Sequence, residues 1–450
     1  MNTGAHQANT PCVVIGLGLT GQSCVRYLRA QGLDVLACDS RADAAGAAAL
    51  RARFPEVEIL TGPLEGERLA RCARLVVSPG VPLSDPALVA ARAAGVEILG
   101  DIELFARAAR APLSAVTGTN GKSTVTTLVA DILEAAGRSV RRGGNLGTPA
   151  LDLLDTVEPD DYVLELSSFQ LELSMSLAPA VATVLNITPD HLDRHGSMDA
   201  YIAAKTRILT HAATAVLNAD DPLVAALPVR GRRIEFTLGA PSHDRFGLRS
   251  IGESQWLAGP EGDLLAVEEL GMSGRHNIAN ALAAAAMASA RGIDYRTIAA
   301  VLRGFRGLPH RVEMAGEIAG VRYVNDSKAT NPGAAIASME GLLGTRNGVL
   351  IAGGDGKGAD FTEFAEVVAR RVHTVVLIGR AARVIERALA GRCECVFATD
   401  MNAAVQAAHI AARAGDVVLL APACASLDMF TSYAERGRAF SAAVAALEHA

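Results

Sequence analysis

Short apolar segments alternate with stretches of helical periodicity along most of the 450-residue chain. Such alternation predicts βαβ units and parallel sheets. The pattern occurs in three sets, which favours three α/β domains over one very large sheet. We expect domains at residues 1–100, 101–308 and 309–450, with joints near Gly100 and Pro309. The apolar runs are residues 11–15, 35–38, 75–77, 113–116, 162–164, 181–185, 215–217, 322–324, 348–351, 375–378 and 417–420.

One stretch of the middle region departs from this alternation. Residues 234–270 are rich in turns and alternating side chains, and they lack helical periodicity. Alternation with a period of two is typical of strands that are buried on one face only. We therefore expect a small antiparallel insertion in the middle domain.

Composition limits the classes of protein to which the chain can belong. With 50% hydrophobic residues, 20% charged residues and a net charge of −6, the chain is neither disordered nor a basic, mainly nucleic-acid-binding protein. The alanine-rich stretch 279–290 is too short to span a membrane, and residues 1–10 lack the pattern of a signal peptide. Seven cysteines without a CxxC pair argue against a zinc ribbon and favour a reduced, cytoplasmic enzyme.

The sequence GTNGKST, residues 118–124, follows an apolar run and precedes a helical stretch. Glycines let backbone N–H groups approach a polyphosphate, and the N-terminus of the helix adds partial positive charge. Lys122 can reach the β- and γ-phosphates, and the hydroxyl of Ser123 or Thr124 can hold Mg²⁺. The motif is tighter than GxxxxGK[ST], because Val116 stands where the first glycine is expected. We interpret it as a phosphate-binding loop.

A second glycine-rich turn lies near the N-terminus. Gly16, Gly18 and Gly21 match the pattern GxGxxG, and Asp39 follows 18 residues after Gly21. This is the pattern of a dinucleotide site with an acid that binds ribose. A tight turn that binds another phosphate is a comparable alternative, and the later phosphate loop makes a plain NAD enzyme harder to sustain.

Acidic and basic side chains follow the apolar runs of the middle domain. Glu165 stands at the end of one predicted strand, and the sequence DHLDRH, residues 190–195, follows another. Mg²⁺ prefers oxygen ligands and usually takes only one or two from the protein besides phosphates, which Glu165 and a loop hydroxyl would supply. The histidines of DHLDRH fit a functional role and a capping role about equally. Lys205 at first resembles an ordinary solvated lysine on a helix.

Three polar loops follow predicted strands of the third set: NDSKATNP at 325–332, GGDGKG at 353–358 and APACAS at 421–426. Ligands of open α/β sheets bind beyond the carboxyl ends of the strands, so three such loops in one domain indicate a binding face. The segment HNIANA at 276–281 precedes an alanine-rich helix, for which a simple helix start with an asparagine cap is the plain alternative.

Together these segments resemble the Mur ligases. The resemblance extends from about Val13 to Phe440, and LSSFQLE with the short N-terminal region favours the member that adds D-glutamate to UDP-N-acetylmuramoyl-L-alanine in peptidoglycan synthesis. Folylpolyglutamate synthetases share the phosphate loop but not the whole set. The motifs are GTNGKST, LELSSFQLE, DHLDRHG, GRHNIANALAA, GLPHRVE, NDSKATNP, GGDGKGADF and PACASLDMF.

The resemblance implies both a fold and a reaction. It implies a Rossmann-like N-domain for the UDP part of the substrate, a P-loop-type central domain for ATP, and a Rossmann-like C-domain that helps to bind the amino acid and closes over the site. The expected enzyme is a cytoplasmic, monomeric, ADP-forming amide ligase that works through an acyl phosphate. It is expected to use two Mg²⁺ ions, and neither NAD, nucleic acid nor a membrane.

The resemblance also assigns residues to each ligand. The ATP site is assigned to Gly118, Thr119, Asn120, Gly121, Lys122, Ser123, Thr124, Asn277, Asn280, Arg311, Asp326 and Lys328. The UDP substrate is assigned to Leu19, Thr20, Asp39, Ser40, Asn145, Ser167 and Gln170. D-Glutamate is assigned to Thr330, Lys357, Ser426 and Tyr433. Metal ions are assigned to Ser123, Glu165, His191 and a carbamylated Lys205, and catalysis to Lys122, His191, Lys205 and Lys357.

Two of these positions, and His195 close to one of them, affect the local chemistry. A carbamate on Lys205 would turn a cation that Mg²⁺ repels into an anionic oxygen ligand. Tyr433 stands where a phenylalanine is expected, which adds a hydroxyl near the amino-acid pocket. His195 stands where an aromatic residue is expected.

The residues alone leave three other functions open. An NAD-dependent oxidoreductase built on GLGLTG and Asp39 leaves the phosphate loop, Glu165 and His191 unexplained. The hypothesis of a non-catalytic nucleotide-binding switch does not explain the polar loops of the third domain. Another amide ligase of the Mur or folylpolyglutamate type would differ only in its acceptor.

Overall fold

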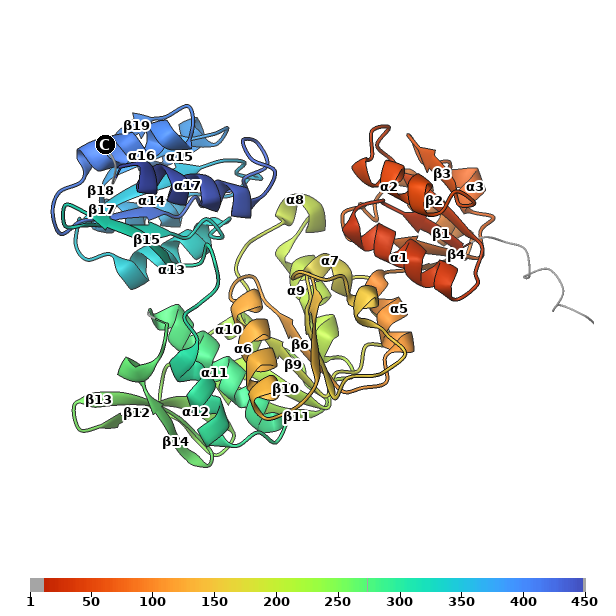
Figure 1. Cartoon of the computed structure of the whole chain (residues 1–450), viewed down its shortest axis with the longest axis horizontal. Helices are drawn as coiled ribbons and strands as arrows, with labels where there is room; N and C mark the ends of the chain where they lie inside the picture. Colours follow the sequence, from red (N-terminus) through yellow and green to blue (C-terminus); the bar gives the residue numbers. More distant parts are fainter. Residues whose placement is uncertain (1–11, 273, 448–450) are drawn as a thin grey trace, which may run out of the picture.

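The computed structural model describes residues 12–272 and 274–447. Their strands form three sheets, and Figure 1 shows helices gathered around these sheets as three lobes in chain order. We refer to them as the N-terminal lobe (strands β1–β5), the central lobe (β6–β14) and the C-terminal lobe (β15–β20). The predicted α/β fold with three sheets is confirmed. The run predicted at 11–15 is observed as β1, Cys12–Ile15, and Pro11 lies outside the described residues.

The N-terminal lobe contains a parallel sheet in the order β3-β2-β1-β4-β5. Its first helix lies very close to the preceding turn, since a β-carbon at Gly21 would lie 1.7 Å from the carbonyl oxygen of Gly16. Only glycine fits there, as the GxGxxG pattern requires. The elements are β1, α1 (Leu19–Ala30), β2 (Val35–Asp39), α2 (Ala45–Arg53), β3 (Glu58–Thr61), α3 (Gly66–Leu69), β4 (Arg74–Val77), α4 (Pro86–Ala93) and β5 (Glu97–Leu99).

The central lobe contains nine strands in the order β14-β13-β12-β11-β10-β9-β6-β8-β7. Its core joins α6 to the alanine-rich α11, whose small side chains let the two helices lie close together. Strands β12–β14 are antiparallel, which confirms the predicted insertion, and they extend the main sheet beyond β11. The strands are β6 (Leu113–Thr117), β7 (Val140–Gly144), β8 (Asp161–Glu165), β9 (Val181–Val184), β10 (Thr214–Asn218), β11 (Arg232–Phe236), β12 (Arg245–Ile251), β13 (Ser254–Gly259) and β14 (Gly262–Ala266). The α-helices are α5 (Asp101–Ala108), α6 (Lys122–Ala135), α7 (Ser168–Leu171), α8 (Leu192–His195), α9 (Met198–Thr206), α10 (Pro222–Ala225), α11 (Arg275–Ala290) and α12 (Tyr295–Gly304).

The C-terminal lobe contains six strands in the order β15-β16-β20-β17-β18-β19, in which β15 pairs antiparallel and the other strands are parallel. The strands are β15 (Glu313–Ile318), β16 (Val321–Asn325), β17 (Gly348–Gly353), β18 (Val372–Ile378), β19 (Glu394–Phe397) and β20 (Val417–Leu420). The helices are α13 (Pro332–Leu342), α14 (Thr362–Arg371), α15 (Ala382–Leu389), α16 (Met401–Ala411) and α17 (Tyr433–Leu447).

The polar loops of the sequence follow the carboxyl ends of buried strands in the central and C-terminal lobes. These strands are β6, β8 and β9 in the central lobe, and β16, β17 and β20 in the C-terminal lobe. Among the described residues, no helix is both long enough and apolar enough to cross a membrane.

Candidate active site

The phosphate loop connects the buried strand β6 to helix α6. Gly121 caps the helix at a φ of 82°, and a β-carbon there would lie 2.4 Å from Oδ1 of Asn280. Lys122 Nζ folds back over the loop and donates to the carbonyl oxygens of Gly118 (2.9 Å) and Thr119 (2.7 Å). Burial lowers the pKa of this lysine. The loop thus presents backbone N–H groups, a helix N-terminus and an ammonium group, which together suit a polyphosphate.

A carboxylate and a hydroxyl lie beside this loop. Ser123 Oγ donates to Oε2 of Glu165 at 2.5 Å, and Asn145 Nδ2 donates to Oε1 at 2.6 Å. Burial alone would raise the pKa of Glu165, but the charge of Lys122 and these two hydrogen bonds hold it below its ordinary value. Glu165 therefore remains an anion, and with Ser123 it offers two adjacent oxygen donors of the kind that Mg²⁺ prefers.

Lys205 is buried beneath the phosphate loop on helix α9. Its side chain is almost fully enclosed, its Nζ donates to the Gly118 carbonyl oxygen at 2.8 Å, and it lies 4.6 Å from the centre of the Tyr201 ring. Burial, and then the charge of Lys122, hold its pKa well below the ordinary value. The first interpretation of Lys205 as a solvated lysine is wrong, because this face of α9 packs against the loop.

His191 caps helix α8 in the left-handed conformation, with a φ of 55°. Its backbone N–H donates to Asp190 Oδ1 at 2.9 Å, and its ring meets the Phe169 ring edge-on. His195 stacks against Phe169 at 5.1 Å, and its Nε2 lies 2.9 Å from Ser168 Oγ. Burial lowers the pKa of His195 to about 4, so this ring is neutral near pH 7 and serves as packing, much like the aromatic residue expected there.

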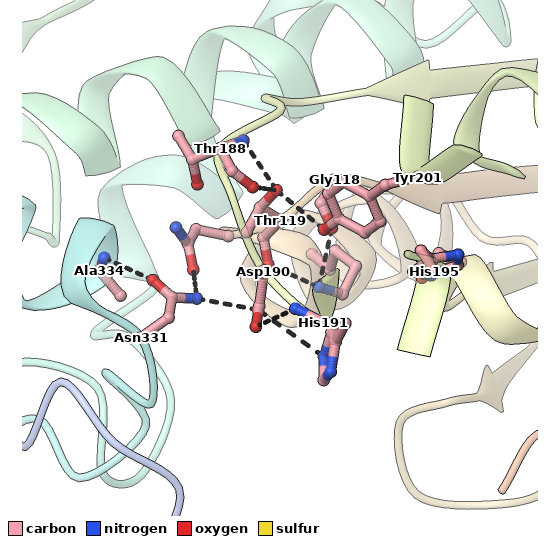
Figure 2. Close-up of polar contacts among 12 residues, drawn as sticks. Gly118, Thr119, Thr188, Asp190, His191, His195, Tyr201, Asn331 and Ala334 are labelled. Atoms are coloured by element: carbon pink, nitrogen blue, oxygen red, sulfur yellow. Dashed lines mark hydrogen bonds and ion pairs between the residues drawn. The ribbon is translucent and has the colours of Figure 1, made fainter. Parts of the chain in front are cut away.

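Hydrogen bonds join the phosphate loop to the loop that carries His191, as Figure 2 shows. Thr119 Oγ1 donates to the Thr188 carbonyl oxygen at 3.1 Å, accepts from the Thr188 N–H at 3.0 Å, and lies 3.0 Å from the Tyr201 hydroxyl. Asn120 and Asn186 exchange two further hydrogen bonds. The two loops therefore form one polar network.

Residues of the C-terminal lobe complete this site. Arg311 Nη2 donates to Ser123 Oγ at 2.7 Å, although the two residues are 188 positions apart. Lys328 lies 4.0 Å from the centre of the Tyr433 ring, and burial lowers its pKa to about 8. A cavity of about 240 Å³ lies between the central and C-terminal lobes. Its lining includes Lys122, Ser123, Asn145, Glu165, Ser167, His191, Lys205, Arg311, Lys328 and Thr330.

Two further cavities adjoin the first. One, of about 260 Å³, brings together much of the set assigned to ATP: Asn120, Gly121, Thr124, Asn277, Asn280, Arg311, Asp326 and Lys328. The other, of about 610 Å³, is lined by Asp190, His191, Thr330 and Lys357, among others. The whole chain contains four lysines, Lys122, Lys205, Lys328 and Lys357, and all four line these cavities.

Some assigned residues lie outside these three cavities. Ser426 and Tyr433 line none of them, and Ser426 is buried. Gln170 is also buried and donates to Asp101 Oδ2 at 3.1 Å, and it forms a capping box with Ser167 on α7.

The residues assigned to the UDP group in the N-terminal lobe are separate from the cavities. Leu19 is exposed at the start of α1, next to Thr20, and Ser40 is exposed after β2. Asp39 accepts hydrogen bonds from the Leu17 N–H and from Arg41, and Arg41 is the main reason that its pKa falls to about 2. A ligand bound to this lobe would have to extend to reach the cavities.

Several residues in the site were missed by sequence reasoning. Phe169 lies within the motif LELSSFQLE, but only the fold reveals its contacts with the two histidines, and only the fold reveals the contact of Tyr201 with Lys205. Arg436 is buried in the C-terminal lobe and donates to the carbonyl oxygens of Ser327 (2.8 Å) and Cys424 (3.1 Å), thereby tying two polar loops together. No feature of the helical pattern around Arg436 indicated that role.

The described residues contain no cluster of three or more His, Cys, Asp or Glu side chains that could hold a metal ion. The donors that are present, Glu165, Ser123 and His191, fit ions that take their remaining ligands from phosphate groups. This is the usual pattern for Mg²⁺ in nucleotide sites.

Three family models match the chain in succession. They are the Mur ligase MurD-like N-terminal domain at residues 10–100, the Mur ligase middle domain at 116–288 and the Mur ligase glutamate ligase domain at 310–424. Each match falls on the sequence of one lobe.

Curated relatives match over nearly the whole chain. The UDP-N-acetylmuramoylalanine--D-glutamate ligase of Nitrosococcus oceani is 46% identical over 439 residues, which is 97% of each chain. The protein of the same name from Pseudomonas aeruginosa is 49% identical over 440 residues, covering 96% of this chain and 97% of the relative.

Solved structures share the fold at lower identity. UDP-N-acetylmuramate-alanine ligase from Thermotoga maritima superposes with a TM-score of 0.61 at 20% identity, covering 98% of this chain and 100% of that one. A pseudomurein peptide ligase type C from Methanothermus fervidus gives 0.60 at 18% identity, covering 92% and 96%. Taken with the family models and the curated relatives, the three-lobed fold and its phosphate-loop site lead to one conclusion: the chain belongs to the Mur ligase family.

Proposed function

We propose that the protein is an ATP-dependent ligase that joins D-glutamate to UDP-N-acetylmuramoyl-L-alanine and releases ADP and phosphate in peptidoglycan synthesis. The observation that carries this proposal is the cavity between the central and C-terminal lobes. There Lys122 and Glu165 of the phosphate site face Arg311 and Thr330 of the other lobe. Relatives at 46–49% identity that carry this ligase name support the choice of substrates.

The reaction needs an activated carboxylate, because a free carboxylate has no leaving group that an amine can displace. The alanyl carboxylate attacks the γ-phosphate of ATP, which forms an acyl phosphate and releases ADP. The amine of D-glutamate then attacks the acyl carbon, expels phosphate and loses a proton. Lys122, Arg311 and Lys328 stabilise the negative charge that develops during phosphoryl transfer.

Two Mg²⁺ ions would be held by two sets of side chains that line this cavity. We assign one to Ser123 and Glu165, whose oxygens are already adjacent, and the other to His191 and a carbamylated Lys205. When bound, the ions neutralise charge on the phosphate oxygens. His191 and Lys205 line the same cavity as Glu165, which supports the assignment of both ions to this cavity.

The environment of Lys205 favours carbamylation. Only the neutral amine can attack CO₂, and burial holds the pKa of Lys205 well below its ordinary value. The new N–C bond forms with loss of one amine proton and leaves an anionic carboxylate on nitrogen. The nearby charge of Lys122 stabilises such an anion.

The amino-acid acceptor is assigned to the C-terminal lobe. Thr330 and Lys357 line the cavity of about 610 Å³, and Lys357 can pair with a carboxylate of D-glutamate. We include Ser426 and Tyr433 in this subsite. The UDP group is assigned to Leu19, Thr20, Asp39 and Ser40, and the muramoyl part to Asn145, Ser167 and Gln170.

We further propose that the enzyme acts as a monomer in the cytoplasm. The central and C-terminal lobes of one chain together line the proposed site, which supports a monomer. All seven cysteines are free, as expected in a reducing compartment that also supplies ATP and UDP-linked substrates.

The proposal is tested by following an oxygen isotope from the substrate carboxylate into the released phosphate. UDP-N-acetylmuramoyl-L-alanine with an ¹⁸O-labelled carboxylate should transfer one label to the released phosphate, and only when ATP and D-glutamate are both present. L-Glutamate and the precursor without alanine serve as controls. Product without label in the phosphate would refute the acyl phosphate, and phosphate release that is independent of D-glutamate would refute the assigned acceptor.

A further inference from the structure

Asn331 lies between the C-terminal lobe and both loops of the phosphate site. It precedes helix α13, its side chain is buried, and it lines both the 240 Å³ cavity and the 610 Å³ cavity. Figure 2 shows its amide nitrogen pointing toward Asp190 and its amide oxygen pointing toward Ala334 of α13. The side chain thus stands where the proposed phosphate and amino-acid sites meet.

The two ends of the Asn331 amide have different partners. Oδ1 accepts from the Ala334 N–H at 2.8 Å, which caps α13. Because that end must accept, Nδ2 is the end that faces the central lobe. It donates to Asp190 Oδ2 at 3.1 Å and to Asn120 Oδ1 at 3.3 Å. One amide therefore joins a helix of the C-terminal lobe to both loops of the phosphate site.

Each of these partners is next to a residue of the proposed chemistry. Asn120 belongs to the loop that contains Lys122, and Asp190 precedes His191, whose N–H it accepts at 2.9 Å. The first turn of α13 also lies close to the same loop, since a β-carbon at Gly333 would lie 3.4 Å from Thr188 Oγ1. A shift of the C-terminal lobe would break the Asn331 bonds before it disturbed the interior of either lobe.

We propose that Asn331 is a positioning residue that couples the closed position of the C-terminal lobe to the geometry of the phosphate loop and of the His191 loop. This proposal rests on the proposed ligase function. Asn331 contributes no reacting atom. It holds Asn120 and Asp190 in a fixed position relative to Arg311 and Thr330 when the lobes are together.

Substitutions can separate this role from helix capping. Aspartate and serine both cap helices well, so Asn331→Asp and Asn331→Ser retain the bond to Ala334. Asn331→Asp replaces the donor by a carboxylate facing Asp190, and Asn331→Ser is too short to reach it. Asp400 caps α16 from an exposed position away from the site, so Asp400→Ala is a matched control for the loss of a cap.

Steady-state kinetics, thermal melting and small-angle scattering should be measured on the parent and on these variants. We expect Asn331→Asp to lower kcat by about 10- to 100-fold, the effect of a lost hydrogen bond to a charged group. The KM for the UDP substrate should stay near the parental value, because the side chain of Asn331 bonds to Asn120, Asp190 and Ala334 and not to the residues assigned to that substrate. Its melting temperature should match the parent, while Asp400→Ala should melt earlier with parental kcat.

A double variant that exchanges the donor and the acceptor provides the decisive test. In Asn331→Asp combined with Asp190→Asn, an amide at 190 can donate to a carboxylate at 331, so kcat should exceed that of Asn331→Asp alone. Parental kcat in Asn331→Asp, or a double variant no better than the single one, would overturn the proposal. A parent that makes no product would instead refute the ligase function. In that case a larger radius of gyration in Asn331→Asp still supports the coupling, and an unchanged one overturns it.

Discussion

Two lysines of the site share one hydrogen-bond acceptor. Lys122 and Lys205 both donate to the carbonyl oxygen of Gly118, and burial lowers the pKa of each. Two buried amines so close together oppose each other's protonation. A polyphosphate beside one and a carbamate on the other would resolve that conflict, so the two proposals about these lysines support each other.

Lys122 provides the first test at this scale. In Lys122→Ala we expect kcat to fall by roughly 10²- to 10³-fold, as for other lost electrostatic donors in active sites. Phosphate release with all three substrates measures the effect, and a melting curve close to the parental one establishes that the fold is retained. Near-parental turnover would contradict a role in phosphoryl transfer.

Lys205 provides a second test. Lys205→Ala should lose most activity, and a small carboxylate such as acetate should restore part of it by replacing the oxygen ligand. Lys205→Arg should also be poor, because guanidinium is a permanent cation without an acceptor. With only four lysines in the chain, ¹³C-bicarbonate should give a carbamate NMR signal that the Lys205 variants lose. Parental activity in Lys205→Arg would show that no carbamate is needed.

Among the elements, helix α5 connects the N-terminal and central lobes and begins with a buried acid. Burial raises the pKa of Asp101 to about 6, against the hydrogen bond from Gln170. In the unfolded chain this group ionises near 3.8, so folding costs an increasing free energy as the pH rises from about 4 to 6. The acid therefore destabilises the fold near pH 7 and not at pH 3.5.

Asp101→Asn should remove this penalty while keeping an oxygen that accepts from Gln170. We expect the free energy of unfolding to rise by up to about 3 kcal/mol at pH 7, with no gain at pH 3.5, since one pKa unit is worth about 1.4 kcal/mol. Urea unfolding of parent and variant at both pH values measures the difference. An equal change at the two pH values would show that ionisation is not the cause.

The elements that sequence reasoning found share a physical property, and so do those it missed. Central strands such as β6 and β17 are buried along their whole length, so each appears as an apolar run. The edge strands β3 and β19 are partly exposed, and β7 has the sequence VRRGG, so no such run marks them.

The same distinction holds within the site. The phosphate loop has a strong local pattern, and its residues 119–124 line two adjoining cavities of the structure. The burial of Lys205 and the two-sided contacts of Asn331 depend on which faces of distant helices meet. Local sequence does not encode that information, and Asn331 alone would be interpreted as an ordinary helix cap.

At the scale of the whole molecule, the proposed ligands span all three lobes. The C-terminal lobe already touches the phosphate site through Arg311 and Asn331. The N-terminal lobe carries the assigned UDP residues, and Arg194 of the central lobe donates to its Val81 carbonyl oxygen at 2.6 Å. A bound UDP substrate must therefore bridge from one lobe into a cavity built by the other two.

That geometry predicts a change of shape on binding. An acyl phosphate is hydrolysed by water, so the lobes must close around it before the amine attacks. Scattering should show a smaller radius of gyration with a non-hydrolysable ATP analogue and UDP-N-acetylmuramoyl-L-alanine together than with either ligand alone. ATP alone has no assigned contact in the N-terminal lobe, and the UDP substrate alone leaves the residues assigned to ATP without their ligand, so both ligands are needed to hold the three lobes together. Identical profiles in every state would mean that closure does not assemble the site, and that water must be excluded within the cavities as they stand.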